Sequence, residues 1–209
     1  KISEIIPVKE FSDNEYLVMV TKNGVIKKTP ASEYESIRKS GKIAITLKEG
    51  DELISIFKTT GNDNIFLATR NGMAICFNEN DARAVGRTAS GVKAIDLADG
   101  DYVVGAEPVR EDSKVLLVTD GGYGKCTDLT SFRIQHRGGK GLKAYKITEK
   151  TGNIIGISMV NDSEELIMVT SEGVVIRIRI KDIATTTGRI TQGVRLINLN
   201  DGVTVVSMD

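Results

Sequence analysis

Four glycine-containing segments of the chain gather positive charge and contain no acidic residue. They span residues 36–48, 83–95, 132–147 and 184–199, and they hold half of the 28 Lys and Arg residues but none of the 28 Asp and Glu residues. Cations neutralise phosphate charge, and the Gly, Ser and Thr residues around them let backbone N–H groups come close to a ligand. These segments therefore predict binding of a polyanion.

The segments recur because the chain is built from repeats of 48 to 51 residues. In every copy a threonine stands three residues before a glycine, at Thr21, Thr69, Thr119 and Thr170. A second glycine follows within each basic segment, at Gly41, Gly91, Gly141 and Gly193. We predict repeats over residues 9–58, 59–109, 110–160 and 161–209, with residues 1–8 as the closing strand of a preceding repeat.

Each repeat has the pattern of four β-strands. Val, Ile, Leu and Thr dominate, apolar and polar residues alternate, and glycines mark the turns. One alternating strand follows the second glycine, at 42–47, 92–97, 142–147 and 194–199, and a closing strand ends each unit. Four-stranded units of this length are typical of propeller blades. We predict an all-β, propeller-like domain, and the extra closing strand at residues 1–8 indicates that neighbouring blades share strands.

Equivalent positions of successive blades lie along one rim, so the basic segments predict a continuous positive band on a chain whose formal net charge is zero. The chain has five Phe, five Tyr and no Trp. Single-stranded nucleic acids are bound through stacking on aromatic side chains, so this composition disfavours them. Duplex DNA, held through its backbone with little sequence preference, is the polyanion that we expect.

Residues 135–141, Gln-His-Arg-Gly-Gly-Lys-Gly, closely resemble the Gln-Arg-Arg-Gly-Gly-Lys-Gly box of the C-terminal domains of DNA gyrase A, with His136 in place of an arginine. The resemblance extends over the chain, through TKNGVIKKTPASEY, GGYGKCT, ITEKTGNIIGI and TTGRITQGVRLI. It implies a β-pinwheel of six blades whose basic outer rim wraps duplex DNA and supports negative supercoiling. The C-terminal domain of the topoisomerase IV A subunit is the near alternative.

The chain departs from that family pattern in two ways. It has about four repeats where the family has six, and its box lies in the third repeat where the family has it in the first. We therefore expect a fragment without the first two blades, in which residues 135–141 are a later echo of the box.

The resemblance also implies partners and a setting. It implies an ATP-dependent type II topoisomerase in the bacterial cytoplasm, associated with the nucleoid, in which this domain acts beside the rest of gyrase A and the gyrase B protein. We expect a monomeric fragment with no cofactor, no metal, no membrane contact and no catalytic residue, because the family's cleavage tyrosine lies in another region. The residues agree with this expectation, since no apolar run approaches 18 residues and His136 is the only histidine.

The predicted DNA contacts are the cations of the basic segments and of the strands beside them. In the third repeat they are Arg137 and Lys140 first, then Arg133, Lys143 and Lys125, within a box completed by Gln135, His136, Gly138, Gly139 and Gly141. In the first repeat they are Arg38, Lys39, Lys42, Lys27 and Lys28. In the second repeat they are Arg83, Arg87 and Lys93, and in the fourth they are Arg177, Arg179, Arg189 and Arg195.

Two other classes of function remain open from the residues. A propeller used as a protein-interaction platform is one, although the Trp-Asp dipeptides of the WD-repeat class are absent. A propeller enzyme with a central site is the other, and it would need Asp, Glu or His converging from several blades. We interpret the recurring threonines as structural turn residues, and Cys76 and Cys126 as unpaired packing residues on separate blades.

Overall fold

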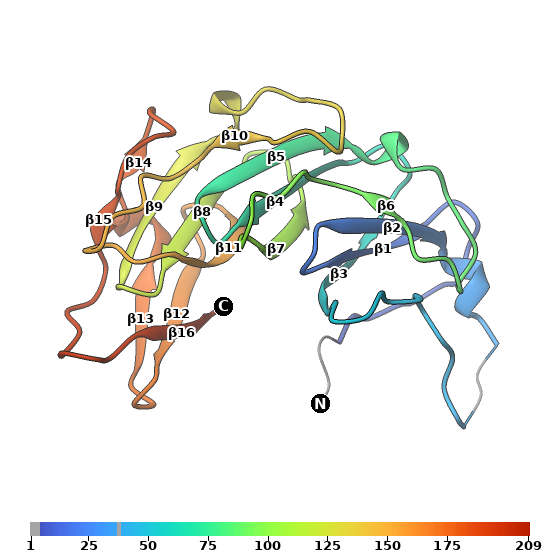
Figure 1. Ribbon diagram of the computed structural model, residues 1–209, viewed down its shortest axis with the longest axis horizontal. Helices are drawn as coiled ribbons and strands as arrows, with labels where there is room; N and C mark the ends of the chain where they lie inside the picture. The colour runs from blue at the N-terminus through green and yellow to red at the C-terminus, as the bar shows by residue number, and fades with distance from the viewer. Residues whose placement is uncertain (1–4, 37–38) are drawn as a thin grey trace.

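The computed structural model describes residues 5–36 and 39–209. In Figure 1 four β-sheets follow one another around an open arc. Within residues 5–36 and 39–209, no helix has the length and apolar character needed to cross a membrane. The all-β, propeller-like fold predicted from the repeats is confirmed.

The repeats contribute similar series of strands and short 3-10 helices. The first has β1 (Tyr16–Thr21), β2 (Val25–Pro30), η1 (Ala31–Tyr34) and β3 (Leu53–Thr59). The second has β4 (Asn64–Thr69), β5 (Met73–Asn78), η2 (Glu79–Asp81), β6 (Val92–Lys93) and β7 (Val103–Pro108). The third has β8 (Lys114–Thr119), β9 (Tyr123–Asp128), η3 (Leu129–Ser131), β10 (Leu142–Lys143) and β11 (Ile154–Val160). The fourth has β12 (Glu165–Thr170), β13 (Val175–Arg179), η4 (Ile180–Asp182), β14 (Thr185–Thr186), β15 (Val194–Arg195) and β16 (Val205–Met208).

The recurring threonine closes the hairpin between the first two strands of every repeat. The hydroxyl of Thr21 accepts the N–H of Val25 at 3.2 Å, and Thr69, Thr119 and Thr170 make the same contact four residues ahead. All four threonines are buried, so this bond satisfies a hydroxyl that has little access to water. Their predicted role as structural turn residues is confirmed.

Each of the first three sheets is completed by a strand from the following repeat. The first three sheets have the orders β3-β1-β2-β6, β7-β4-β5-β10 and β11-β8-β9-β14, and β15 also pairs with β9. Figure 1 places β6, β10 and β15 on the outer side of the arc. Strand sharing was predicted, but through the closing strand. The structure instead shares the segment after the second glycine, while the closing strands β3, β7, β11 and β16 stay in the sheets of their own repeats.

This exchange explains two predicted strands that do not form. Residues 42–47 of the first repeat are in no strand, because β6 already completes the sheet of their own repeat and no described sheet precedes it. Residues 5–8, the described part of the predicted closing strand 1–8, are in no strand either. The fourth sheet, β13-β12-β16, has three strands among the described residues instead of the four predicted.

The hydrophobic core lies between the sheets, and alternate residues of one strand serve two neighbouring cores. Ile65 and Leu67 of β4 pack against the first sheet, whereas Phe66 and Ala68 pack against the third. A strand buried on both faces needs an unbroken apolar run, which β4 and β8 have. Strand β12 instead alternates between buried and exposed residues at its start, because only one face of the fourth sheet is covered.

The second glycine of a repeat lies against the outer strand of the preceding sheet. A Cβ atom added to Gly141 would lie 2.4 Å from the carbonyl oxygen of Ala74. Gly91 and Gly193 meet the carbonyls of Ile26 and Gly124 in the same way, at 2.4 and 2.3 Å. Among the described residues no sheet precedes Gly41, and a Cβ there would have none of their atoms within 4 Å. The glycine thus permits the close approach through which one repeat completes the sheet of another.

Substitution of Gly141 by Ala tests this close contact. We expect Gly141→Ala to lower the free energy of unfolding by about 3 kcal/mol, from strain at its positive φ and from the clash with the Ala74 carbonyl. Gly41→Ala has a similar φ of 73° but meets no neighbour, so about 1 kcal/mol of strain alone is expected. Urea unfolding of both variants measures the difference, and equal losses would contradict the role of the contact.

Candidate nucleic-acid interface

The basic segments of three repeats form loops on the outer side of the arc. We call residues 82–91, 132–141 and 184–193 the perimeter loops; each leads into the short strand that completes the preceding sheet. In Figure 1 they appear in green, yellow and orange-red along the convex edge, outside β2, β5 and β9. The structure therefore places equivalent loops of successive repeats along one edge.

Several predicted cations are exposed and have no hydrogen bond or ion pair through their side chains within residues 5–36 and 39–209. These are Lys39, Arg83, Arg133, Lys140 and Lys143. Sequence reasoning missed two further exposed lysines, Lys48 and Lys146. Both stand in the acid-free segments, so the charge pattern that identified the other residues was also the signal for these two.

Other predicted cations are accessible but already engaged. Lys93 pairs with Asp96 at 2.8 Å, and Lys42 donates to the carbonyl of Glu33 at 3.2 Å. Arg195 donates from Nε and Nη2 to the hydroxyl of Tyr123, at 3.1 and 2.9 Å. These side chains are held in place before any ligand arrives.

Arg177 and Arg179 lie on β13 rather than in a perimeter loop. Arg177 is 3.6 Å from Glu165, and Arg179 is 2.8 Å from Asp182. Both ion pairs are exposed, so each contributes little to stability. Predicted contact Arg38 lies outside the described residues.

Lys27, Lys28 and Lys125 are buried, so their prediction as DNA contacts was wrong. The ammonium group of Lys27 donates to the carbonyls of Ala44 and Arg87, beneath the loop of the second repeat. Lys125 donates in the same way to the carbonyl of Arg189 and, at 3.1 Å, to the hydroxyl of Thr191. A buried charge needs such partners, and here they are mainly backbone groups of the loop.

Lys28 forms a buried ion pair between the first two repeats. Its ammonium group is 2.8 Å from the carboxylate of Glu79, which also accepts bonds from the hydroxyl of Thr59 and from the N–H groups of Gly61 and Asp63. Both oxygens of this carboxylate accept bonds, and Lys28 donates in addition to Oδ1 of Asn80 at 3.1 Å. The buried pair therefore joins the first two repeats.

The box at residues 135–141 is bound to its neighbours at almost every residue. Gln135 donates its N–H to the carbonyl of Cys76, and the N–H of Gly138 bonds to Ala94 at 2.6 Å. The ring of His136 is 3.2 Å from Asp81, although its side chain is 98% exposed. Lys140 is exposed near Asp96, and Gly139 beside it is exposed and accepts the N–H of Asp96.

Three arginines of the perimeter loops, Arg87, Arg137 and Arg189, are half-buried and donate to backbone carbonyls. Arg137 donates from Nε to Asp81 at 2.8 Å and from Nη1 to Lys93 at 2.9 Å. Arg87 donates from Nη1 to the carbonyl of Ile43 at 2.6 Å, and Arg189 does the same to Lys143 at 3.1 Å. Arg137, predicted as the first DNA contact, therefore has much of its donor capacity committed within the protein.

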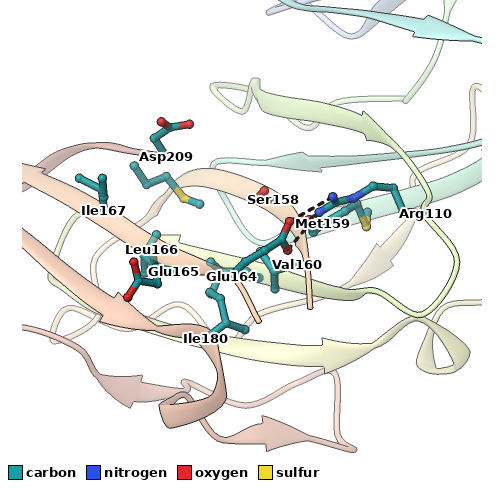
Figure 2. A pocket seen from close by; sticks show the side chains of 12 residues that line it. Arg110, Ser158, Met159, Val160, Glu164, Glu165, Leu166, Ile167, Ile180 and Asp209 are labelled. Atoms are coloured by element: carbon teal, nitrogen blue, oxygen red, sulfur yellow. Dashed lines mark hydrogen bonds and ion pairs between the residues drawn. The ribbon is translucent and has the colours of Figure 1, made fainter. Parts of the chain in front are cut away.

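A cleft between the third and fourth sheets is lined by apolar side chains and by one ion pair. Figure 2 shows Arg110 and Glu164 joined across its mouth by two bonds of 3.2 and 3.3 Å, with Leu166 and Ile180 among its apolar lining. The two charges neutralise one another. Across residues 5–36 and 39–209, no cluster of three or more His, Cys, Asp or Glu side chains could hold a metal ion. Cys76 and Cys126 are free and buried on different sheets, as expected.

Comparison with known proteins decides the family. The sequence model described as DNA gyrase C-terminal domain, beta-propeller, matches residues 15–60, 63–110, 113–161 and 164–209. This chain belongs to the DNA gyrase C-terminal domain family. The four matches cover nearly the whole chain, and they follow the four sheets of the structure.

Relatives agree with this assignment. The chain is 57% identical to the DNA gyrase A subunit of Halalkalibacterium halodurans over 99% of its length, and 49% identical to that of Clostridium acetobutylicum over 100%. It spans about a quarter of the length of these relatives, 25% in both cases.

The arc also matches solved structures of such domains. A crystal structure of the C-terminal domain of DNA topoisomerase IV superposes with a TM-score of 0.91 at 30% identity, over 97% of this chain and 64% of that one. A structure of a DNA gyrase A C-terminal domain superposes with a TM-score of 0.85 at 26% identity, over 96% and 67%.

The buried lysine beneath the second repeat's loop predicts a pH-dependent stability. Burial, together with the charge of Arg87, lowers the pKa of Lys27 from 10.5 to about 8. Above that pH the folded chain releases this proton while the unfolded chain still holds it, so the free energy of unfolding rises with pH. Relative to Lys27→Ile, which copies Ile75 of the second repeat, the wild-type chain should gain about 2 kcal/mol between about pH 8 and about pH 10.

Urea unfolding at a series of pH values checks this expectation. The difference in free energy of unfolding between wild type and Lys27→Ile removes the contribution of all other titrating groups, because both proteins contain them. Lys125→Ile, at the equivalent position of the third repeat, should behave alike, because burial lowers the pKa of Lys125 to about 8 as well. A difference between wild type and variant that does not change with pH would contradict the buried titration.

Proposed function

We propose that this chain is a duplex-DNA binding and wrapping module of DNA gyrase A. The observation that carries the proposal is the group of exposed cations on the outer edge of the arc. Arg83 and Arg133 lie in successive perimeter loops and have no ion pair within the described residues, and Lys140 is exposed near Asp96. A group of this kind is the electrostatic footprint expected for contacts to a phosphate backbone. The family to which the chain belongs supports the same conclusion.

The shape of the chain favours duplex DNA bent around the outside of the arc. DNA is stiff over lengths below its persistence length of about 150 base pairs, so bending it requires contacts at several separated points. The perimeter loops supply such points along a convex edge. Stacking of single-stranded bases is disfavoured, because Tyr123, Tyr145 and Phe66 are buried and Phe11 is the single large aromatic side chain exposed among the described residues.

Within the complete protein, the proposed role is to position DNA for strand passage and so to support the introduction of negative supercoils. The chain would act beside the remainder of gyrase A and the gyrase B protein, and it would contribute no chemistry of its own. The chain then contributes to supercoiling only through its contacts with DNA. Binding affinity and DNA bending are therefore the properties to measure.

A C-terminal domain of topoisomerase IV is the second candidate. The TM-score of 0.91 favours it, since the gyrase domain superposes less closely at 0.85. Identity of 57% to a gyrase A protein supports the first candidate more strongly. Plasmid topology separates them: restored to its full-length protein and combined with gyrase B, a gyrase domain should support negative supercoiling of relaxed plasmid with ATP, whereas a topoisomerase IV domain should support relaxation only.

The salt dependence of duplex binding tests the proposed interface. Each phosphate contact contributes about 0.9 to the slope of the logarithm of the binding constant against the logarithm of salt concentration. Replacing Arg133, Lys140 and Lys143 together by Ala should therefore lower the slope by about 2 to 3. Fluorescence anisotropy of a labelled duplex of random sequence measures it, and a longer duplex should bind more tightly than a short one.

The matched control replaces Lys22 and Lys58 by Ala. Both are lysines outside the perimeter loops, paired with Glu52 and Glu15 in the first repeat. The control should leave the slope close to that of the wild type. Equal losses from both sets of substitutions would overturn the assignment of the interface, and absence of binding at low salt would overturn the proposed function.

A further inference from the structure

One arginine occupies the same position in three consecutive repeats and makes the same contact each time. Arg87, Arg137 and Arg189 each stand four residues before the second glycine of their repeat. Each donates from Nη1 to the carbonyl oxygen two residues after the second glycine of the preceding repeat, in Ile43, Lys93 and Lys143, at 2.6, 2.9 and 3.1 Å. Because the same bond occurs at three junctions, it is a regular feature of the repeat.

A backbone hydrogen bond accompanies the arginine at every junction. The N–H of Asp96 donates to the carbonyl of Gly139 at 2.9 Å, from the preceding segment to the next loop. The equivalent bonds run from Thr46 to Ala89 and from Lys146 to Thr191, at 3.2 and 3.0 Å. Successive perimeter segments are therefore bonded to one another directly, in addition to the strand pairing beneath them.

The arginines are also restrained from below in two of the three junctions. Lys27 donates to the carbonyl oxygen of Arg87, and Lys125 donates to that of Arg189. At the remaining junction Ile75 replaces the lysine, and Arg137 makes a second bond, from Nε to Asp81. Each arginine is thus held by a second bond, at its backbone carbonyl in Arg87 and Arg189 and at Nε in Arg137. An arginine kept free for a ligand would not require this second bond.

We propose that Arg87, Arg137 and Arg189 are positioning residues that fasten each perimeter loop to the segment after the second glycine of the preceding repeat and thereby set the curvature of bound DNA. This inference rests on the proposed DNA-binding function and assigns two different roles to the cations of the perimeter loops. Exposed side chains such as Arg133 and Lys140 neutralise phosphates, whereas the fastening arginines hold the loops that present them. Guanidinium suits this task, because its planar fork can donate to two carbonyls at once and a lysine ammonium cannot match that geometry.

Arg137→Lys separates fastening from charge, because it keeps the positive charge and loses the fork. We expect amide hydrogen exchange to accelerate about two- to tenfold at Gly138 and Asp96, whose N–H groups bond across this junction, the change that loss of one hydrogen bond implies. We expect the salt slope of a short duplex to stay unchanged, while energy transfer between dyes at the ends of a long duplex falls because the DNA is bent less.

Arg133→Lys is the matched control, since Arg133 lies in the same loop, is exposed and has no side-chain partner among the described residues. It should leave exchange and bending as in the wild type. Unchanged exchange in Arg137→Lys would overturn the fastening role, and so would a drop of about 0.9 in the salt slope of Arg137→Ala with no change in exchange. Failure of the wild-type chain to bind duplex DNA would overturn the proposed function and the role of these arginines in DNA curvature. The amide hydrogen exchange rates of Arg137→Lys would still show whether Arg137 fastens the loop.

Discussion

The outermost strand of each of the first three sheets comes from the following repeat, and the remaining architecture depends on that exchange. The carbonyl of Gly24 accepts the N–H groups of Ala94 and Ile95, and Gly72 and Gly122 receive equivalent pairs from the next repeats. The second glycine of the repeat makes room for this approach by lacking a Cβ atom. An unpaired strand edge would otherwise present a row of free N–H and C=O groups. Backbone pairing therefore fixes the distance between the first glycine of one repeat and the second glycine of the next repeat. The same pairing fixes the spacing of the perimeter loops along the edge.

Residues of the same charge take three different roles around these loops. Buried lysines such as Lys125 donate to loop carbonyls from beneath, because a desolvated ammonium group is tolerated only when its donors are satisfied. Half-buried arginines such as Arg137 bond to neighbouring loops, and exposed cations such as Arg133 have no partner in the described chain. The depth at which a strand or loop places the side chain decides which of these roles it takes.

Several acidic residues hold turns outside the perimeter loops, whereas Asp81 and Asp96 contact the loop at 132–141. Asp51 accepts the N–H of Asn23, Asp101 accepts that of Asn71, and Asp120 accepts that of Asn153, so these carboxylates hold the turns between strands. Separation of the two signs gives a positive edge on a chain with no net charge. That edge is what a DNA-binding member of the gyrase C-terminal domain family would use, and it depends on placement rather than composition.

The sequence by itself determined the number of repeats, the all-β class, the turn role of Thr21 and its equivalents, and the segments that carry the perimeter loops. These are properties of spacing and alternation, which a linear chain displays directly. Only the tertiary structure decided which strand is exchanged between repeats. Residues 42–47 and 92–97 have the same pattern and differ in whether a preceding sheet among the described residues is there to pair with them. The tertiary structure also decided that Lys27 and Lys28 point inward while Arg133 is exposed, because the next repeat covers the outer strand of the sheet before it. A contact between residues about fifty positions apart leaves no local signal, so the role of each cation appeared only when the repeats were packed together.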